Sequence, residues 1–237
     1  MGIYRNLSPE EYGDLEQRIL YEDNHLLVFN KRTGEIVQGD KTGDEPLSET
    51  LKAFIAQRDG KPGQVFMGVP HRLDRPVSGV CLFAKTSKAL ERLNGMLRAG
   101  EIHKTYWALV AARPPKEEDT LTDFLVRNEA QNKSYVSKKD GKEARLHYQL
   151  IQTTDRYFLL EVQLFTGRHH QIRCQLAHMG CPIKGDLKYG ARRSNPDGGI
   201  SLLARRIQFI HPVKKTQVDV TAPVPENWKG IRDSAED

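Results

Sequence analysis

Two adjacent strand-like runs constrain the fold of this 237-residue chain more than any other feature. Residues 144–152 (ARLHYQLIQ) and 156–165 (RYFLLEVQLF) are rich in apolar and aromatic residues, and only Thr153, Thr154 and Asp155 separate them. Runs of this length around a short polar turn predict a β-hairpin. A connection this short can join only antiparallel strands, so the chain must build part of its sheet from antiparallel pairs.

Other segments show the periodicity of strands or of helices. Further strands are expected within residues 19–39, 77–85, 104–112, 201–212 and 216–225. Helices are expected over residues 46–60, from Thr86 or Ser87 to Gly100, and over residues 168–180. These helices interrupt the hairpins without a strict βαβ alternation. We therefore expect an α+β fold with a largely antiparallel mixed β-sheet flanked by helices and loops.

Composition limits where such a chain can work. No apolar run approaches the ~18–20 residues that a membrane-spanning helix needs. Residues 1–17 are acidic and polar, which is not the pattern of a secretory signal, and we expect them to form an N-terminal arm. The cysteines, Cys81, Cys174 and Cys181, are odd in number. A disulfide framework is therefore not expected, and we expect a cytoplasmic protein.

The net charge of +5 is unevenly spread along the chain. Residues 1–70 hold 8 Lys and Arg against 12 Asp and Glu, whereas residues 71–237 hold 28 against 19. The stretch 166–215 alone holds 10 against 2, a net charge of +8. Such a concentration favours a polyanionic partner, most simply a nucleic acid. The alternative is a solvated face whose sign has no function.

An ionisable cluster directly precedes one of the apolar runs. His71, Arg72 and Asp74 surround Leu73, just before VSGVCLFAK at residues 77–85. A carboxylate in that place is poorly solvated, which raises its pKa above the usual ~3.9 unless a cation compensates. The sequence Asp-x-Pro-x-Ser-Gly is also good turn chemistry. Asp74 is therefore a candidate for catalysis, with a turn or cap aspartate as the alternative.

Arg173 is a candidate partner for such a carboxylate. On a helix over residues 168–179 it shares a face with Ile172 and Leu176, so the helix carries it toward the core. A guanidinium there needs a carboxylate, and Asp74 is one candidate. The alternative is a side chain whose stem is packed and whose head reaches water. Tyr106, in the strand-like 104–112, is either core filling or an aromatic face for a nucleobase.

One helical cluster resembles a metal site. His170, Cys174 and His178 share a helix face, at positions i, i+4 and i+8. The chain contains no HExxH and no paired CxxC, which are the spacings typical of zinc sites. It also lacks a GxxxxGK[ST] loop and a GxGxxG after a strand. We therefore expect neither a metal nor a cofactor.

Several of these segments together resemble the RluA-type RNA pseudouridine synthases. The motifs occur in the family's order: HRLDRPVSG (71–79), KTYWALV (104–110) and TGRHHQIRCQLAHMGCPIKGDLKYG (166–190). NKRTGEIV resembles the family's lead-in, and LLARRIQFIHP with TAPVP resembles its close. The resemblance covers about residues 18–225, which implies one pseudouridine-synthase-like catalytic domain followed by a tail over 226–237.

The resemblance implies an isomerisation of uridine in RNA, without cofactor or metal. The bond from ribose to N1 of uracil breaks, the base turns, and a bond to C5 forms. Asp74 aligns with the family's catalytic aspartate, and Arg173 aligns with the basic residue that pairs with it. Tyr106 aligns with the tyrosine that stacks on the uracil. Arg72 aligns with the arginine that enters the space left by the flipped nucleotide.

Further RNA contacts are expected from the same motifs and from the basic segment 184–215. They are His71, Lys104, Arg168, His170, Gln171, Lys184, Lys188, Arg192 and Arg193. Two positions depart from the common family pattern: Val77 replaces a threonine, and Leu203 replaces a histidine. Neither change removes a catalytic group.

The resemblance also bears on partners. The small N-terminal RNA-binding domain of many relatives has no room here, so we expect target choice to rest on the catalytic domain. The expected substrate is tRNA or rRNA, with a compact stem-loop, as in tRNA, preferred over a long ribosomal site. We expect a monomer with no membrane and no obligate protein partner. The alternatives are a non-catalytic RNA-binding protein on the same fold and a metal-dependent nuclease that uses the His/Cys helix.

Overall fold

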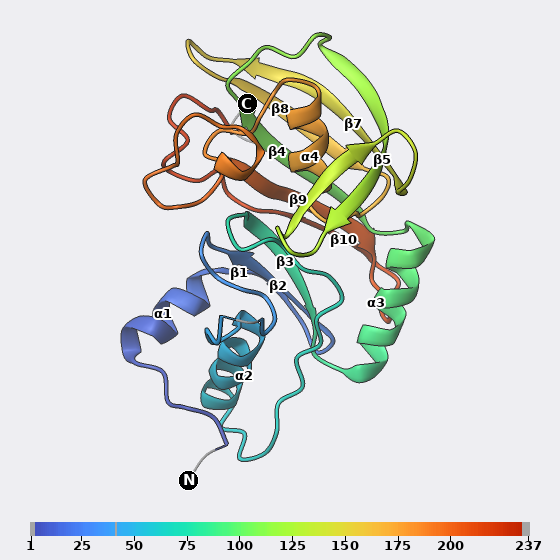
Figure 1. The fold of residues 1–237 in the computed structure, drawn as a ribbon. Helices are drawn as coiled ribbons and strands as arrows, with labels where there is room; N and C mark the ends of the chain where they lie inside the picture. The colour runs from blue at the N-terminus through green and yellow to red at the C-terminus, as the bar shows by residue number, and fades with distance from the viewer. Residues whose placement is uncertain (1–2, 41, 234–237) are drawn as a thin grey trace. The chain divides into compact units, whose positions relative to one another are not determined.

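The computed structural model describes residues 3–40 and 42–233, and the chain divides into two compact units. Unit 1 comprises residues 1–102 and 206–222, and unit 2 comprises residues 103–205 and 223–237 (Figure 1). The chain passes from unit 2 back into unit 1 inside a strand, between Arg205 and Arg206. Each unit is described separately below.

Unit 1 combines helices with short antiparallel strands. Its elements in chain order are α1 (Pro9–Gln17), β1 (Ile19–Glu22), β2 (Leu26–Lys31), α2 (Leu47–Arg58), β3 (Ser78–Ala84), α3 (Ser87–Ala99) and, after the return of the chain, the second half of β9 (Leu202–Ile210) and β10 (Gln217–Thr221). The pairs β1–β2, β2–β3 and β9–β10 are antiparallel. β3 is buried from Gly79 to Ala84, and β2 is buried at every position except Asn30. The two strands therefore form the core of this unit.

The helices of unit 1 begin and end at residues that satisfy their free backbone groups. Ser8 and Glu11 form a capping box at the start of α1, where Pro9 occupies the first turn. Thr86 accepts a hydrogen bond from the amide of Ala89 and so caps α3. Gly100 ends α3 with φ at 73°, a left-handed conformation that glycine adopts without strain. The expected start and end of this helix are confirmed.

The described residues of unit 2 form an antiparallel sheet and one helix of eight residues. Its elements are β4 (His103–Val110), β5 (Glu118–Asn128), β6 (Lys133–Ser137), β7 (Lys142–Thr153), β8 (Phe158–Leu164), α4 (Gln171–His178), the 3₁₀ turn η1 (Leu187–Tyr189) and the first half of β9. The strand order runs β4-β8-β7-β5-β6, which places β6 at an edge. The predicted hairpin is confirmed as β7–β8. The pairs β5–β6 and β5–β7 were not predicted.

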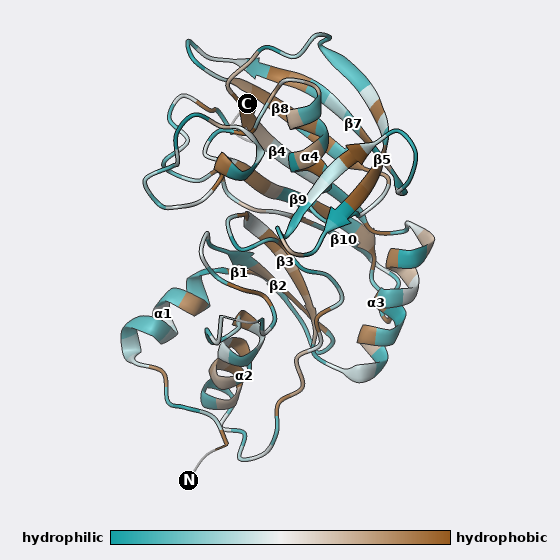
Figure 2. Ribbon diagram, in the orientation of Figure 1, coloured by the Kyte–Doolittle hydropathy of each residue, from teal (hydrophilic) through white to brown (hydrophobic). Residues whose placement is uncertain are grey.

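The two faces of the unit 2 sheet differ. Leu125 of β5 and Ala144 of β7 are buried together with Cys174 of α4 and Tyr189 of η1. Gln175 of α4 also donates hydrogen bonds to this face of the sheet, to the carbonyl of Ala144 among others. The residues between these positions in the strands point to the other face, since side chains alternate along a strand. Figure 2 shows that β5 and β7 each contain both hydrophobic and hydrophilic residues.

Sequence and structure agree on the fold class and differ at the N-terminus. The α+β class with largely antiparallel pairing is confirmed. Residues 1–17, expected as an arm, contain helix α1 and belong to unit 1. The structure describes the tail only to residue 233, and residues 223–233 contain no helix or strand. Among the described residues, no helix is long and apolar enough to cross a bilayer.

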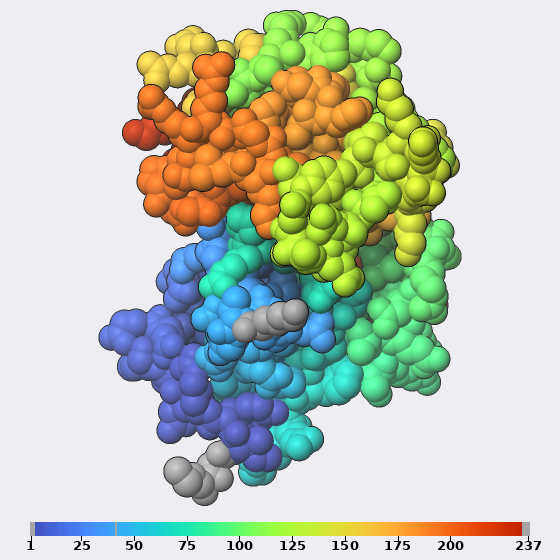
Figure 3. All heavy atoms as spheres, in the orientation of Figure 1, coloured from blue at the N-terminus to red at the C-terminus, as the bar shows by residue number. Residues whose placement is uncertain are grey.

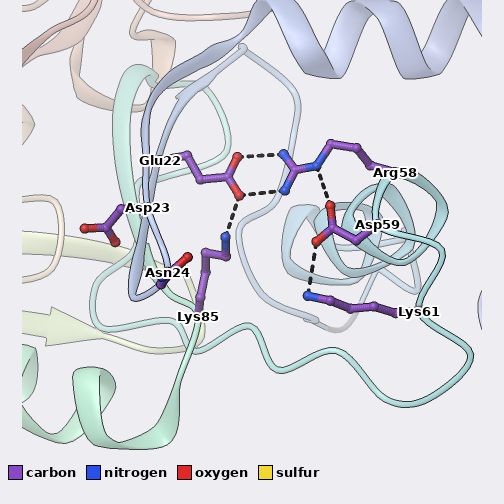
Figure 4. A pocket seen from close by; sticks show the side chains of 7 residues that line it. All are labelled: Glu22, Asp23, Asn24, Arg58, Asp59, Lys61 and Lys85. Carbon is purple, nitrogen blue, oxygen red and sulfur yellow. Dashed lines mark hydrogen bonds and ion pairs between the residues drawn. The ribbon is translucent and has the colours of Figure 1, made fainter.

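A charged pocket of about 500 Å³ lies where α2 ends beside β1 and β3 (Figure 4). Glu22 accepts two hydrogen bonds from Arg58, at 2.7 and 2.8 Å, and pairs with Lys85 at 2.5 Å. Arg58 also pairs with Asp59, which in turn pairs with Lys61. Burial by itself would raise the pKa of Glu22, but the hydrogen bonds from Arg58 and Lys85 outweigh it, and the pKa lies below its ordinary value.

We predict that Glu22→Gln lowers the free energy of unfolding at pH 7 by about 1–3 kcal/mol, because two partly buried cations lose their shared anion. Because the carboxyl pKa of Glu22 is lower in the folded protein, its ionised form stabilises the fold fully at any pH above the ordinary pKa of 4.5. This stabilisation is lost as the pH falls through the folded-state pKa. Urea unfolding should therefore show a gap between wild type and variant that narrows from pH 7 to pH 3. Glu49→Gln is the control, since Glu49 of α2 pairs with Lys52, a neighbour three residues along the same helix. A gap that is constant with pH would contradict the assignment.

Candidate functional site

Asp74 lies in the loop that leads into β3. The amide of Val77 donates to the Asp74 carbonyl at 3.0 Å, which closes a tight turn before the strand. Leu73 and Val77 are buried on either side of it, whereas Asp74 is half-buried and Arg72 is exposed. His71 Nε2 accepts a hydrogen bond from the amide of Leu82 at 3.0 Å. The first residue of the HRLD segment, His71, is thus bonded to β3, and its last residue, Asp74, is bonded to the turn that leads into β3.

The Lys31 side chain holds this loop from inside the core. Lys31 ends β2, is 0% exposed, and directs its ammonium at the backbone of the loop. Its Nζ lies 2.6 Å from the carbonyl oxygen of Val77, 3.1 Å from that of Arg75 and 3.3 Å from that of Asp74. The carbonyl of Arg32 is a fourth acceptor, at 2.9 Å. One buried cation therefore fixes the backbone on which the Asp74 carboxylate stands.

Burial sets the charge balance of Lys31. It lowers the pKa of Lys31 to about 8, because the charged form loses its hydration. The negative charges of Glu35 and Asp74 act in the opposite direction and favour the ammonium. Lys31 and Asp74 are therefore coupled electrostatically as well as through the backbone.

We predict that Lys31→Met destabilises the protein at pH 7 by about 2–3 kcal/mol, because buried carbonyls lose their donor. The sign of the pH effect follows from the lowered pKa. Between pH 8 and the ordinary value of 10.5 the unfolded chain binds more protons than the folded one, so the wild-type free energy of unfolding rises relative to that of the variant. Urea titrations at pH 7 and 9.5 measure both effects. Lys88→Met, at an exposed position of α3, is the control. A gap that shrinks at pH 9.5 would contradict a lowered pKa.

Tyr106 and Lys104 lie on β4 in unit 2. Tyr106 is 8% exposed and stands opposite Val162 of β8. Lys104 is two residues earlier on the same strand face, and burial lowers its pKa. Tyr106 is buried and Lys104 is partly buried, which fits either core packing or a site from which water is excluded.

Arg173 is buried, as its helix face predicts, and its counter-ion within unit 2 is Asp186. The guanidinium is bidentate, with Nε 2.7 Å from Asp186 Oδ2 and Nη2 2.9 Å from Oδ1. The two side chains are 6% and 1% exposed. Gly185 allows this approach: its φ is +87°, and a Cβ there would lie 2.7 Å from the carbonyl oxygen of Gly199. Asp186 was not predicted from the sequence.

His170 and Tyr189 complete the surroundings of Arg173. Arg173 Nη1 lies 3.2 Å from His170 Nε2, and the Tyr189 ring lies under the guanidinium at 5.1 Å. Because arginine can only donate, Nε2 accepts, and the neutral imidazole carries its hydrogen on Nδ1, 3.0 Å from the Tyr189 hydroxyl. Burial, and then the charge of Arg173, lower the pKa of His170 to about 2. A neutral ring and a carboxylate thus orient the guanidinium together.

Other residues expected to bind RNA also have contacts within the protein. Gln171 is 3% exposed, accepts from Thr166 and from the amide of Arg168, and donates to the Arg145 carbonyl. Arg168 Nε donates to the Glu143 carbonyl, and Lys184 lies 5.1 Å from the ring of Tyr157. The hydrogen bonds of Gln171 and Arg168 shape the turn before α4, a role that the sequence did not reveal.

Among the cations expected to bind RNA in this part of the chain, Arg168, Lys188, Arg192 and Arg193 are exposed. Lys188 donates to the Asn132 carbonyl at 3.1 Å, which joins η1 to the end of the β5–β6 hairpin. Cys174 donates to the Ser134 carbonyl, and His170 contacts Arg173 and Tyr189, so two members of the His/Cys cluster have protein partners. Among the described residues, no group of three or more His, Cys, Asp or Glu could hold a metal ion.

The structure brings together some of the predicted site residues. It places His170 against Arg173 and adds Asp186 and Tyr189 to them. Asp74 belongs to unit 1, whereas Tyr106 and Arg173 belong to unit 2, and the pairing of Asp74 with Arg173 stays a prediction. Asp186 and Tyr189 lie in the motif GDLKYG. The glycine directly before the aspartate was the only feature of the sequence that could have pointed to Asp186 as a partner of Arg173. The only sequence signal for the role of Lys31 was its position at the end of an apolar strand.

We predict that Asp186→Asn destabilises the protein by about 3–5 kcal/mol, because it removes the charge that the buried Arg173 faces. Thermal and urea unfolding at pH 7 measure the loss. Asp155→Asn, in the exposed β7–β8 turn, is the matched control and should change little. If Asp186→Asn lowers the free energy of unfolding no more than Asp155→Asn does, the Arg173–Asp186 pair adds no stability.

Comparisons of sequence place this chain among known proteins. A family model described as RNA pseudouridylate synthase matches residues 25–178. An uncharacterized RNA pseudouridine synthase of Bacillus subtilis (strain 168) is 34% identical over 212 residues, which cover 88% of this chain and 69% of that protein. The ribosomal large subunit pseudouridine synthase C of Vibrio cholerae is 33% identical over 218 residues, which cover 90% of this chain and 67% of that protein. The chain thus spans about two thirds of the length of these relatives.

A comparison of structures agrees with this result. The solved structure described as Human RNA Pseudouridylate Synthase Domain Containing 4 superposes with a TM-score of 0.76 at 22% sequence identity. The match covers 91% of this chain and 92% of that one, so the two share a fold.

Proposed function

Because this chain belongs to the RluA-type family of RNA pseudouridine synthases, we propose that Asp74 is the carboxylate with which it converts uridine in structured RNA to pseudouridine. The observation that carries the proposal is the fixed position of Asp74. It lies inside the matched range 25–178, on a loop that Lys31 holds from within the core. A reacting group must be positioned before the substrate arrives, and a backbone held by a buried cation does this.

The reaction is an isomerisation that this chain's own side chains can support. The bond from ribose C1′ to N1 of uracil breaks and a bond from C1′ to C5 forms. N1 gains a proton and C5 loses one, so nothing is oxidised or reduced. Asp74 acts as a nucleophile or as an electrostatic partner at the ribose while the base is detached. Water must be excluded at that stage, because it would add to C1′ of the ribose in place of C5 and leave the uracil detached.

Tyr106 and Arg173 have supporting roles in this proposal. Tyr106 stacks on the uracil and moves a proton, and its low exposure fits a site without water. Arg173 keeps the Asp74 carboxylate charged, and its orientation is set by Asp186 and His170. The target uridine must leave its stack to reach these groups, and the exposed guanidinium of Arg72 fills the space that it leaves.

The exposed cations are the proposed contacts to the RNA backbone. Arg168, Lys188, Arg192 and Arg193 are exposed, and their neighbourhood contains few acids. Phosphate contacts of this kind supply most of the affinity for RNA and weaken with salt. His71, His170 and Gln171 have partners in the protein and act by holding the site in shape.

Ribosomal or transfer RNA is the proposed substrate. The name of the Vibrio cholerae relative supports a site in large-subunit ribosomal RNA, whereas a compact catalytic unit favours a stem-loop such as that of tRNA. We propose that the chain acts in the cytoplasm, where cysteines stay reduced; Cys81, Cys174 and Cys181 are buried and free.

We predict that Asp74→Asn abolishes the release of tritium from RNA that carries 5-tritiated uridine, because bond formation at C5 expels that hydrogen. The affinity of the variant for RNA should change less than twofold or so, since phosphate contacts dominate binding. The assay uses wild type, Asp74→Asn and the control Asp155→Asn, with tRNA and rRNA fractions tested separately and a chelator present.

The outcomes separate the hypotheses. Release by wild type and control alone supports the proposed role of Asp74, and the responding fraction identifies the substrate class. Binding without release from any fraction would point to a non-catalytic RNA-binding protein. Release that the chelator abolishes would contradict a metal-free reaction.

A further inference from the structure

We propose that an exposed aromatic stripe on the sheet of unit 2 binds unpaired nucleotides of the RNA substrate, separately from the residues assigned to the reaction. The stripe consists of Phe124 and Val126 on β5, Tyr135 on β6 and Phe165 just after β8. These side chains are 50%, 39%, 41% and 55% exposed, respectively. The proposal rests on the proposed function only in taking RNA as the substrate.

Strand register makes the stripe continuous. Val126 stands directly opposite Tyr135 in the β5–β6 pair. In the β5–β7 pair, Arg145 is the diagonal neighbour of Phe124 on the same face. The Arg145 guanidinium then lies 4.8 Å from the centroid of the Phe165 ring. The stripe therefore extends from β6 across β5 and β7 to the end of β8, with the Arg145 guanidinium stacked on Phe165.

The stripe lies on the face of the sheet opposite to α4. Leu125 and Ala144 are buried against Cys174 and Tyr189, and their neighbours in sequence point the other way. Phe124, for example, is half exposed although it adjoins the buried Leu125. Arg173 lies on α4, so the stripe is on a different side of unit 2 from this candidate site residue.

Charge and aromatic character together favour RNA as the occupant. Residues 127–145 hold six Lys and Arg against three Asp and Glu, so the hairpin region is cationic. Exposed aromatic side chains on a sheet bind single-stranded nucleic acid because any base can stack on them, and cations beside them neutralise phosphates. A second copy of the chain would need about 800 Å² of complementary surface on each partner. Apolar side chains interleaved with charged ones fit that occupant less well.

The edge strand β6 connects the two faces. Lys133 Nζ lies 5.1 Å from the ring centroid of Tyr135 and 5.1 Å from that of Tyr189. Tyr189 contacts Arg173 from the α4 side, so Lys133 lies between the stripe and the surroundings of Arg173. Lys188 adds a second cation beside the same hairpin. Figure 3 shows the β5–β6 hairpin at the surface in yellow-green.

The first test compares RNA affinity with turnover. In the double variant Tyr135→Ala/Phe165→Ala, both Kd and KM for the responding RNA should rise by roughly tenfold for each lost stack. kcat at saturating RNA and the melting temperature should not change. The control is Ile151→Ala, which removes an apolar side chain of similar exposure from β7 outside the stripe. An unchanged Kd and KM, or a loss confined to kcat, would overturn the proposal.

The second test maps the contact directly and separates it from the proposed function. Asp74→Asn is irradiated with RNA that carries 5-iodouridine, and crosslinked peptides are identified by mass spectrometry. Crosslinks at Tyr135 or Phe165 are expected, and their absence would overturn the stripe. Crosslinks there without tritium release by wild type would refute the proposed function and leave the stripe standing. A dimer that sedimentation detects in wild type, and that the double variant loses, would assign the surface to a second copy instead.

Discussion

The geometry of the Asp74 loop depends on the hydrogen bonds that the buried Lys31 ammonium donates to backbone carbonyls. A buried cation costs free energy unless its hydration is replaced, and here the backbone carbonyls of Arg32, Asp74, Arg75 and Val77 replace it. Three of those carbonyls belong to one short turn. The turn therefore cannot change shape without exposing the ammonium to an apolar core, and this fixes the backbone of Asp74.

Arg173 is a buried cation that is held in a different way. Lys31 is surrounded by backbone, so its ammonium fixes a loop. Arg173 is surrounded by side chains, Asp186, His170 and Tyr189, so these fix the guanidinium itself. The planar fork of arginine suits the second arrangement, because each edge of the group can meet a separate partner. A compact ammonium suits the first, because its donors can point to several carbonyls.

Much of the fold could be predicted from the sequence, because local periodicity reports local structure. The β7–β8 hairpin, α2 and α3 follow from patterns that each lie within one segment. β5 was missed because exposed apolar residues obscure its alternation: Phe124 and Val126 flank the buried Leu125. α1 was missed because only Leu15 is buried, so the segment lacks a continuous apolar face, although the capping box of Ser8 and Glu11 was readable.

The candidate site was less predictable, for a related reason. The burial of Arg173 follows from its helix face, but its partner Asp186 is 13 residues away, beyond a turn that Gly185 makes possible. The contacts of Lys31 span more than 40 residues, and no local pattern reports them. The roles of Asp74, Tyr106 and Arg173 came from the resemblance of whole motifs.

His170 shows how this site departs from ordinary helix design. It stands at the N-cap of α4 with φ at 53°, a left-handed conformation uncommon for a residue with a side chain, and it makes no capping hydrogen bond. A serine or aspartate there would cap the helix, but it would offer Arg173 no ring. The imidazole instead points to Arg173 and Tyr189, and the hydrogen bonds to both hold the unusual backbone in place. The local strain thus has a physical reason in the orientation of one guanidinium.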